Sequence, residues 1–218
     1  MNLDIEHKLF NEPFPHLIIE NFLSENQQKE ILNEILEVEK SNIVKKVMDG
    51  RFQFPINLFK TKSLSKKLFN FFNTKETFEL IKKKLIPSSL STEFSLEFNE
   101  YNNFSKKEYF YQKFFKKIFA FIYKKNYFLH MDFSVAKNNY FREPHHDKET
   151  RIINFLLYLN TTENDQGGSL EIYKFKDKKN YDRFPKLDEI QIEKKIEPKG
   201  GKLVAFLSCP NSIHGVEK

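Results

Sequence analysis

Apolar positions in the first part of the chain form a short continuous run and then a helical repeat. The run Pro13 to Phe22, read as PFPHLIIENF, is bounded by prolines and Asn21, which predicts a strand. Ser24 follows it, and Gln27 lies at the spacing from which its side chain can return to the backbone of the capping residue. The apolar residues beyond recur at helical spacing, so the sequence predicts a helix that begins at Ser24.

Two further helices are predicted to begin near Ser63 and Thr74, the second ending before Pro87. Another is predicted from about Ser105 to Lys125, where aromatic residues repeat at helical spacing and lysines fill the remaining positions. A basic amphipathic helix of this kind either lies on a membrane surface or packs its aromatic face against a sheet. Packing is favoured, because a β core with one uncovered flank offers a place for that face.

Beyond this helix the pattern changes to short strands separated by glycines and prolines. The predicted strands are Tyr127 to Ala136, Ile152 to Asn160, Ser169 to Phe175 and Lys202 to Leu207. The charged stretch from Lys174 to Lys195 is interpreted as a hairpin excursion between two of them. We therefore expect one domain over residues 1–218, with mostly helical support in 1–126 and a β core in 127–218.

Composition narrows the possible locations and partners. There are 36 Lys and Arg against 30 Asp and Glu, a net charge of +6 that can attract anionic partners. Abundant Lys, Asn, Ile and Phe with little Ala is also what a genome poor in G and C imposes, and this explanation is favoured, so nucleic acid is not the expected partner. The single Cys209 excludes an internal disulfide and zinc sites built on paired cysteines.

The opening segment from Met1 to Phe10 carries early acidic residues and lacks the apolar run of a signal peptide. No later stretch reaches the roughly 18 uncharged apolar residues that a membrane span needs. We therefore expect a soluble cytoplasmic protein.

Three residues form the candidate chemistry. His145 and Asp147 are two positions apart, so in an extended chain their side chains can point to the same face while His146 points away. His214 follows a later strand and can return beside them. Two imidazoles and one carboxylate on one face of an octahedral ion leave positions open for further ligands, the arrangement suited to Fe(II) chemistry.

A second pair has the same spacing. His130 and Asp132 lie in an apparently continuous strand with Phe128 and Phe133 close by. A pair at the edge of a loop has more room to admit a substrate, so His130 and Asp132 are predicted to be structural.

Four motifs in order carry a family resemblance: PHHDKETRIINFLLYLN, GGSLEIY, IEPKGGKLVAF and IHGV, preceded by PFPHLIIENFLS. They resemble the prolyl 4-hydroxylase type of Fe(II)- and 2-oxoglutarate-dependent oxygenase. The resemblance covers the N-terminal start and nearly everything from Phe133 to Val216, whereas the stretch from Ser41 to Asn126 has no counterpart among these motifs.

The resemblance implies an α+β fold with a mainly β core, a double-stranded β-helix or jelly roll with N-terminal supporting helices. It puts His145, Asp147 and His214 in the three iron positions. Tyr158 matches a tyrosine that hydrogen-bonds the distal carboxylate of 2-oxoglutarate, although a buried aromatic with a paired hydroxyl is an equal alternative. The implied cofactors are Fe(II) and the cosubstrate 2-oxoglutarate, and ascorbate is left open as a further one.

One position departs from the family. Relatives carry an Arg or Lys on the last core strand, well beyond the distal His, where it pairs with the outer carboxylate of the cosubstrate. This sequence stops at Lys218, four residues beyond His214, which strand geometry makes too close. Either the core lacks its last strand, or another cation such as Arg151 or Lys202 takes the role. The absence of the last strand is favoured, because a jelly roll that ends here leaves an unprotected sheet edge, which a further strand would cover.

The implied activity is hydroxylation of an unidentified small molecule or protein side chain with O2, releasing succinate and CO2. Two other classes stay open. A catalytically inactive jelly-roll module could retain metal ligands without turnover, and a basic module could bind nucleic acid or another anion through its lysines. The sequence predicts neither the substrate nor the oligomeric state.

Overall fold

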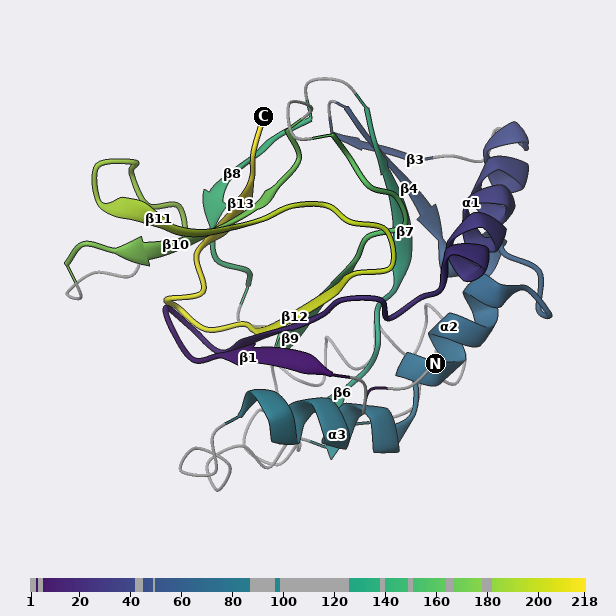
Figure 1. Cartoon of the computed structure of the whole chain (residues 1–218), viewed down its shortest axis with the longest axis horizontal. Helices are drawn as coiled ribbons and strands as arrows, with labels where there is room; N and C mark the ends of the chain where they lie inside the picture. Colours follow the sequence, from purple (N-terminus) through teal and green to yellow (C-terminus); the bar gives the residue numbers. More distant parts are fainter. Residues whose placement is uncertain are drawn as a thin grey trace, which may run out of the picture.

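The computed structural model describes residues 3, 6–41, 45–48, 50–86, 97–98, 126–137, 140–148, 151–163, 167–177 and 182–218. Two layers of strands face each other, and helices cover the outer side of one layer (Figure 1). The described helices are α1 (Glu25–Lys40), α2 (Leu64–Phe72) and α3 (Lys75–Leu85), with a short 3-10 helix η1 (Ile56–Leu58). The helix predicted from Ser105 to Lys125 lies outside the described residues.

The strands group into two main sheets and two smaller ones. The first main sheet has the order β1 (His7–Phe10), β2 (His16–Ile19), β12 (Leu203–Leu207), β9 (Ile153–Leu157). The second has the order β11 (Ile190–Ile196), β10 (Leu170–Phe175), β13 (His214–Val216), β8 (Arg142–His145). The smaller sheets are β3 (Lys45–Met48), β4 (Arg51–Pro55), β7 (Asp132–Ala136), and β5 (Glu97–Phe98) with β6 (Asn126–Tyr127).

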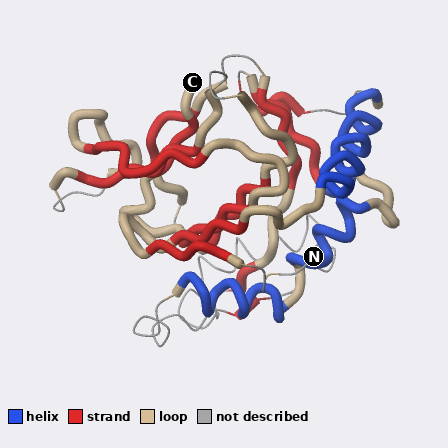
Figure 2. Tube along the Cα trace, in the orientation of Figure 1, coloured by secondary structure: helices blue, strands red, loops and turns tan. Residues whose placement is uncertain are grey.

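Strands far apart in sequence are neighbours in both main sheets, and Figure 2 shows that strand makes up most of the regular structure. All pairings within the two main sheets are antiparallel. Two facing antiparallel sheets with such connections form the jelly roll that the sequence predicts, so the predicted fold is confirmed.

The first main sheet is buried on both faces, which explains the uninterrupted apolar run of β12. Leu203 and Ala205 point into the cluster shared with the helices, whereas Val204 and Phe206 point into the space between the two sheets. Side chains alternate along a strand, so a strand covered on both sides needs apolar residues at every position. This double burial fixes the register that brings Phe206 to the site described below.

The three described helices begin where the sequence predicts. The Ser24 side chain accepts from the Gln27 backbone N–H and the Gln27 side chain accepts from the Ser24 backbone N–H, the reciprocal pair predicted for α1. Ser63 and Thr74 cap α2 and α3 in the same way with single side-chain bonds. Their apolar faces pack against the first main sheet, where Ile81 and Leu85 join the shared cluster.

A strand forms within each predicted segment but is shorter than expected, and the segment Tyr127 to Ala136 is interrupted between β6 and β7. Several observed strands are missing from the prediction. The missed strands are β1, β3, β4, β5, β8 and β13, and the excursion after Lys174 ends in the seven-residue strand β11. The pair predicted to lie at the edge of a loop does so, because His145 is the last residue of β8 and Asp147 lies in the segment between β8 and β9. Strand β8 contains Pro144, and a proline in a short segment normally argues against a strand.

Candidate metal centre

Two of the candidate ligands face each other across a pair of strands. His145 of β8 and His214 of β13 are direct partners in the antiparallel pairing, and their ring centroids lie 4.6 Å apart. Residues opposite each other on neighbouring strands project to the same side of the sheet. Both imidazoles therefore project to one side of the second main sheet, although 69 positions separate them in the sequence.

Asp147 joins this pair from the segment that follows β8. Its Oδ2 lies 3.8 Å from Nε2 of His214, and its Oδ1 accepts a hydrogen bond from Nη1 of Arg151 at 2.8 Å. One ligand atom from each of the three residues lies within 4.8 Å of the others. Within the described part of the chain no other group of histidine, cysteine and acidic side chains converges in this way.

Backbone carbonyls hold both imidazoles in the orientation that a metal requires. Nδ1 of His145 donates to the Glu143 carbonyl at 2.8 Å, and Nδ1 of His214 donates to the Ser212 carbonyl at 2.9 Å. Because a carbonyl oxygen only accepts, each Nδ1 carries the proton and each Nε2 keeps its lone pair free for a metal. This is the usual outer support of a metal-binding histidine.

Burial keeps these two imidazoles neutral. Burial, together with the neighbouring His214, lowers the pKa of His145 to about 4. Burial is also the main cause that lowers the pKa of His214, to which the charges of Arg151 and Arg142 add. A neutral imidazole is the form that binds a metal, so neither side chain has to lose a proton at neutral pH.

The neighbouring histidine takes no part in the group. Nδ1 of His146 bonds the Asp147 carbonyl at 2.8 Å, and its backbone pairs with that of Arg183. The alternative pair behaves as a surface interaction, since Nε2 of His130 lies 3.3 Å from Oδ2 of Asp132 and the His130 side chain is 80% exposed. Gln53 also donates to Asp132. The structural role predicted for His130 and Asp132 agrees with these contacts.

Comparisons with known proteins agree with this arrangement. Residues 119–218 match the family described as "2OG-Fe(II) oxygenase superfamily". This part of the chain is similar to the members of that superfamily. The sequence resemblance to 2-oxoglutarate oxygenases is thereby confirmed. No curated protein sequence matches the chain.

A solved structure with the same fold is the crystal structure of a Pseudomonas putida prolyl-4-hydroxylase. Its TM-score is 0.56 at 15% sequence identity, and the match covers 92% of this chain and 84% of that one. At this identity the likeness shows the fold. The fold match covers most of the chain, whereas the family match covers only its C-terminal part. No helix in the described part of the chain is long and apolar enough to span a bilayer.

Tyr158 lies on the inner side of the jelly roll. Its ring packs against the cluster between the sheets, which includes Ile18, Leu170 and Val204. Burial raises the pKa of the Tyr158 hydroxyl well above its usual range, so the group stays protonated and can donate a hydrogen bond. This fits both a cosubstrate contact and a core aromatic, the two roles that the sequence left open.

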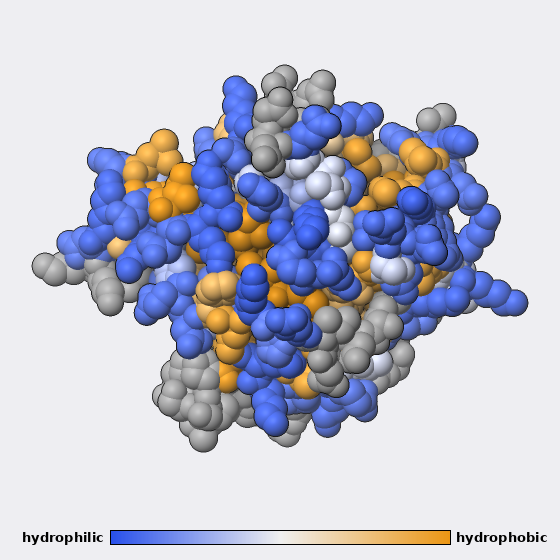
Figure 3. All heavy atoms as spheres, in the orientation of Figure 1, coloured by the Kyte–Doolittle hydropathy of each residue, from blue (hydrophilic) through white to orange (hydrophobic). Residues whose placement is uncertain are grey.

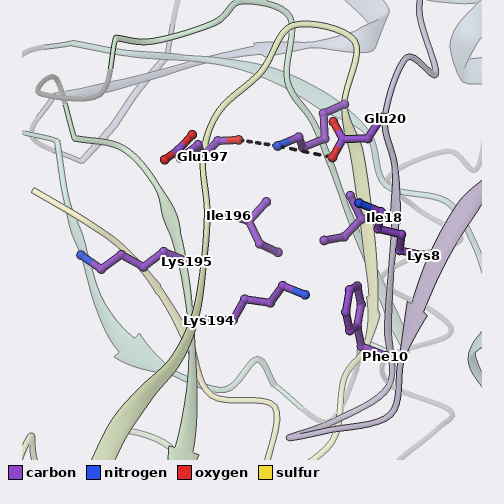
Figure 4. Close-up of a pocket in the computed structure, with 9 residues that line it drawn as sticks. Lys8, Phe10, Ile18, Glu20, Lys194, Lys195, Ile196 and Glu197 are labelled. Carbon is purple, nitrogen blue, oxygen red and sulfur yellow. Dashed lines mark hydrogen bonds and ion pairs between the residues drawn. The ribbon is translucent and has the colours of Figure 1, made fainter.

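The cations considered as cosubstrate anchors have other partners. Arg151 holds Asp147, as described above. The Lys202 amine donates to the Glu197 carbonyl at 2.9 Å and lies 3.8 Å from Oε1 of Glu20. These contacts border a pocket of about 250 Å³ between β1 and β11, whose lining includes none of His145, Asp147 and His214 (Figure 4).

Two polar groups near the site were missed by the sequence reasoning. Asn154 and His16 are the strand partners of Phe206 on either side, and the Phe206 ring lies 4.7 Å from that of His214. Nδ2 of Asn154 and Nε2 of His16 are buried without a hydrogen-bond partner among the described residues. Such atoms are rare and mark places where a ligand or water is expected. Alternation back along the chain from Tyr158, four positions later, could have identified Asn154.

Apolar side chains remain visible between the two strand layers. Figure 3 shows them near the middle of the displayed face, with hydrophilic side chains around them. Leu156 of β9, two positions after Asn154, is 36% exposed although it shares the inward face of that strand. The inner face of β9 is therefore open to a ligand at this point.

Proposed function

We propose that this chain is an Fe(II)- and 2-oxoglutarate-dependent dioxygenase that hydroxylates its substrate and releases succinate and CO2. His145, Asp147 and His214 are the proposed iron ligands. Residues 1–218 would form a single oxygenase domain.

The observation that carries the proposal is the convergence of two imidazole nitrogens and one carboxylate oxygen within 4.8 Å, in the part of the chain that matches the superfamily. Iron with 2-oxoglutarate supplies the oxidising power in this chemistry. Two histidines and one carboxylate are the donor set typical of non-haem Fe(II) oxygenases, and they leave positions for a bidentate cosubstrate and O2. The free Nε2 atoms and the neutral imidazoles fit that ion.

The remaining residues have supporting tasks. Arg151 fixes one oxygen of Asp147 and leaves the other directed at the centre. Tyr158 is the proposed donor to the outer carboxylate of 2-oxoglutarate, and the unpaired amide of Asn154 offers a further donor on the same face of β9. Phe206 and the apolar cluster beside it exclude water from the inner side of the centre.

The test is turnover of 2-oxoglutarate without added substrate. The protein is loaded with Fe(II) without oxygen, 2-oxoglutarate is added, and succinate is measured after exposure to air, with and without ascorbate. We expect succinate from the wild type, none from Asp147→Ala, and a wild-type yield from Asp132→Ala, the matched aspartate of the surface pair. Absence of succinate from metal-loaded wild type would reject the oxygenase and favour an inactive metal-binding jelly roll.

Location is a separate proposal. The only cysteine, Cys209, is free in the structure. A chain without disulfides suits a reducing compartment, so we place the protein in the cytoplasm.

A further inference from the structure

Arginine is rare in this chain and is concentrated at the metal centre. Of the 36 Lys and Arg residues only four are arginine, at positions 51, 142, 151 and 183. Three of them contact or flank the His145 to Asp147 segment. A compositional preference for lysine does not explain this placement, because the bias would act equally along the whole chain.

Arg142 is turned toward the centre by an irregularity in the sheet. His214 pairs with His145 and Val216 pairs with Arg142, so three positions along β8 correspond to two along β13. Such a bulge changes which side chains share a face, and here it puts Arg142 on the same side as His145. The Arg142 guanidinium has no hydrogen bond or ion pair within the described part of the chain. Its charge acts on both imidazoles.

The other two arginines lie around the same segment. Arg151 contacts Asp147 and its side chain is 59% exposed, so part of the guanidinium is available to a ligand. Nε of Arg183 donates to the His146 carbonyl at 3.3 Å, and the His146 backbone N–H donates to the Arg183 carbonyl at 3.1 Å. Among the metal-ligand candidates beside these arginines, the only carboxylate is that of Asp147, and it already pairs with Arg151.

An aromatic residue lies beside these arginines. Phe184 is 56% exposed, and its ring centroid lies 6.3 Å from that of His145 at an interplanar angle of 20°. The Arg183 guanidinium lies over the same ring at 4.8 Å. Because Phe184 is engaged by both side chains, its ring is poorly placed to stack a nucleobase.

We propose that Arg142, Arg151 and Arg183 bind an acidic group, a carboxylate or a phosphate monoester, on the substrate of this centre. Guanidinium groups present several donors in a plane that matches the oxygens of such groups, and these charge-assisted bonds are stronger than neutral ones. The binding of an acidic group is inferred from the arginines alone, and only the statement that this group belongs to a substrate rests on the proposed oxygenase. It adds a substrate class to that proposal.

Binding of a probe tests the proposal without turnover. A labelled oligoglutamate peptide is titrated into the metal-free full chain at low ionic strength, with oligoglutamine as the neutral probe. We expect oligoglutamate to bind and oligoglutamine not to bind. Arg142→Gln and Arg183→Gln should each weaken binding by roughly tenfold, the size expected for one charge-assisted hydrogen bond. Displacement by inorganic phosphate would assign the phosphate form, and resistance to it would assign the carboxylate form.

Arg51→Gln is the matched control, because it makes the same change of charge at an arginine bonded to Ser134 on β4. It should leave binding unchanged. Equal weakening in all three variants, or none, would overturn the proposal and indicate attraction to the net positive charge. Tighter binding of oligothymidylate with the same loss in Arg142→Gln would overturn it in favour of nucleic acid.

A second titration distinguishes a role in cosubstrate binding. If Arg142→Gln abolishes 2-oxoglutarate binding to the Mn(II)-loaded chain while oligoglutamate still binds, Arg142 is a cosubstrate anchor and the assignment is wrong. The peptide titration contains neither metal nor 2-oxoglutarate. Its failure is therefore distinguishable from failure of the proposed oxygenase, which the succinate assay reports.

Discussion

His145 and His214 are direct partners on the antiparallel strands β8 and β13, with ring centroids 4.6 Å apart. The hydrogen-bonded ladder of the sheet therefore builds two thirds of the candidate ligand set, and only Asp147 comes from outside a strand. A site held by a sheet is more precise than one assembled from loops. The ligand atoms should keep this arrangement in the metal-free protein.

Single replacements of the three ligand candidates should remove metal binding and leave the fold. His145→Ala, Asp147→Ala or His214→Ala should each lower the affinity for Mn(II), used as an oxygen-stable substitute for Fe(II), below detection in calorimetric titration. His146→Ala should bind like the wild type, because His146 lies outside the ligand group. Circular dichroism checks the fold. Equal loss in the His146 variant would contradict the assigned ligand set.

Arg151→Gln should weaken metal binding without removing a ligand. Arg151 donates to Oδ1 of Asp147 at 2.8 Å, and removal of such an orienting partner typically costs about 10- to 100-fold in metal affinity. Lys148→Gln is the control, since Lys148 is exposed, adjacent to Asp147 and carries the same charge. An Arg151→Gln affinity equal to that of Lys148→Gln would mean that the ion pair does not orient the ligand.

Spacing and motifs predicted the three residues that converge, because a short His-x-Asp segment and a distant His are local features of the sequence. The inward position of Arg142 could not be predicted in this way. It depends on a bulge between β8 and β13, and a bulge follows from the pairing of two strands rather than from either one. Strand β8 itself was missed because it contains Pro144 and two charged residues, which local propensities exclude from strands.

The metal-free protein should lose stability as pH falls from about 6.5 to about 4, the window in which His145 is neutral when folded and protonated when unfolded. Within that window the unfolded chain binds the extra proton, so the free energy of unfolding decreases as pH decreases. Thermal unfolding in the presence of a chelator at several pH values measures this. His145→Gln should show a shallower decrease.

His130→Gln is the control for that titration, because the shift there has the opposite sign. A hydrogen bond with Asp132 is the main cause that raises the pKa of His130. Its contribution is present below the unfolded pKa and is lost as pH rises through the folded one. The variant should therefore keep the acid-side decrease of the wild type. A shallower decrease in His130→Gln than in His145→Gln would reject the assignment to the buried imidazole.

Phe206→Ala should destabilise the fold and disturb the centre together. Phe206 is 1% exposed, packs against Phe14 with ring centroids 5.9 Å apart, and lies 4.7 Å from the ring of His214. Truncating a buried phenylalanine typically costs about 3 to 5 kcal/mol, through lost burial and the cavity that remains. The cavity would lie beside His214 and loosen that ligand, so Mn(II) affinity should fall as well.

Leu156→Ala is the matched variant for that experiment, since Leu156 also points inward from the first main sheet but is 36% exposed. Its side chain gives up less buried surface, so urea unfolding should show a clearly smaller loss of stability than for Phe206→Ala. It should also leave Mn(II) affinity near the wild-type value, because Leu156 has no ring contact with a ligand candidate. A Phe206→Ala protein as stable as Leu156→Ala would mean that the space between the sheets is not closely packed around Phe206. Normal Mn(II) affinity in a destabilised Phe206→Ala protein would instead show that the sheet pairing alone holds His214 in position.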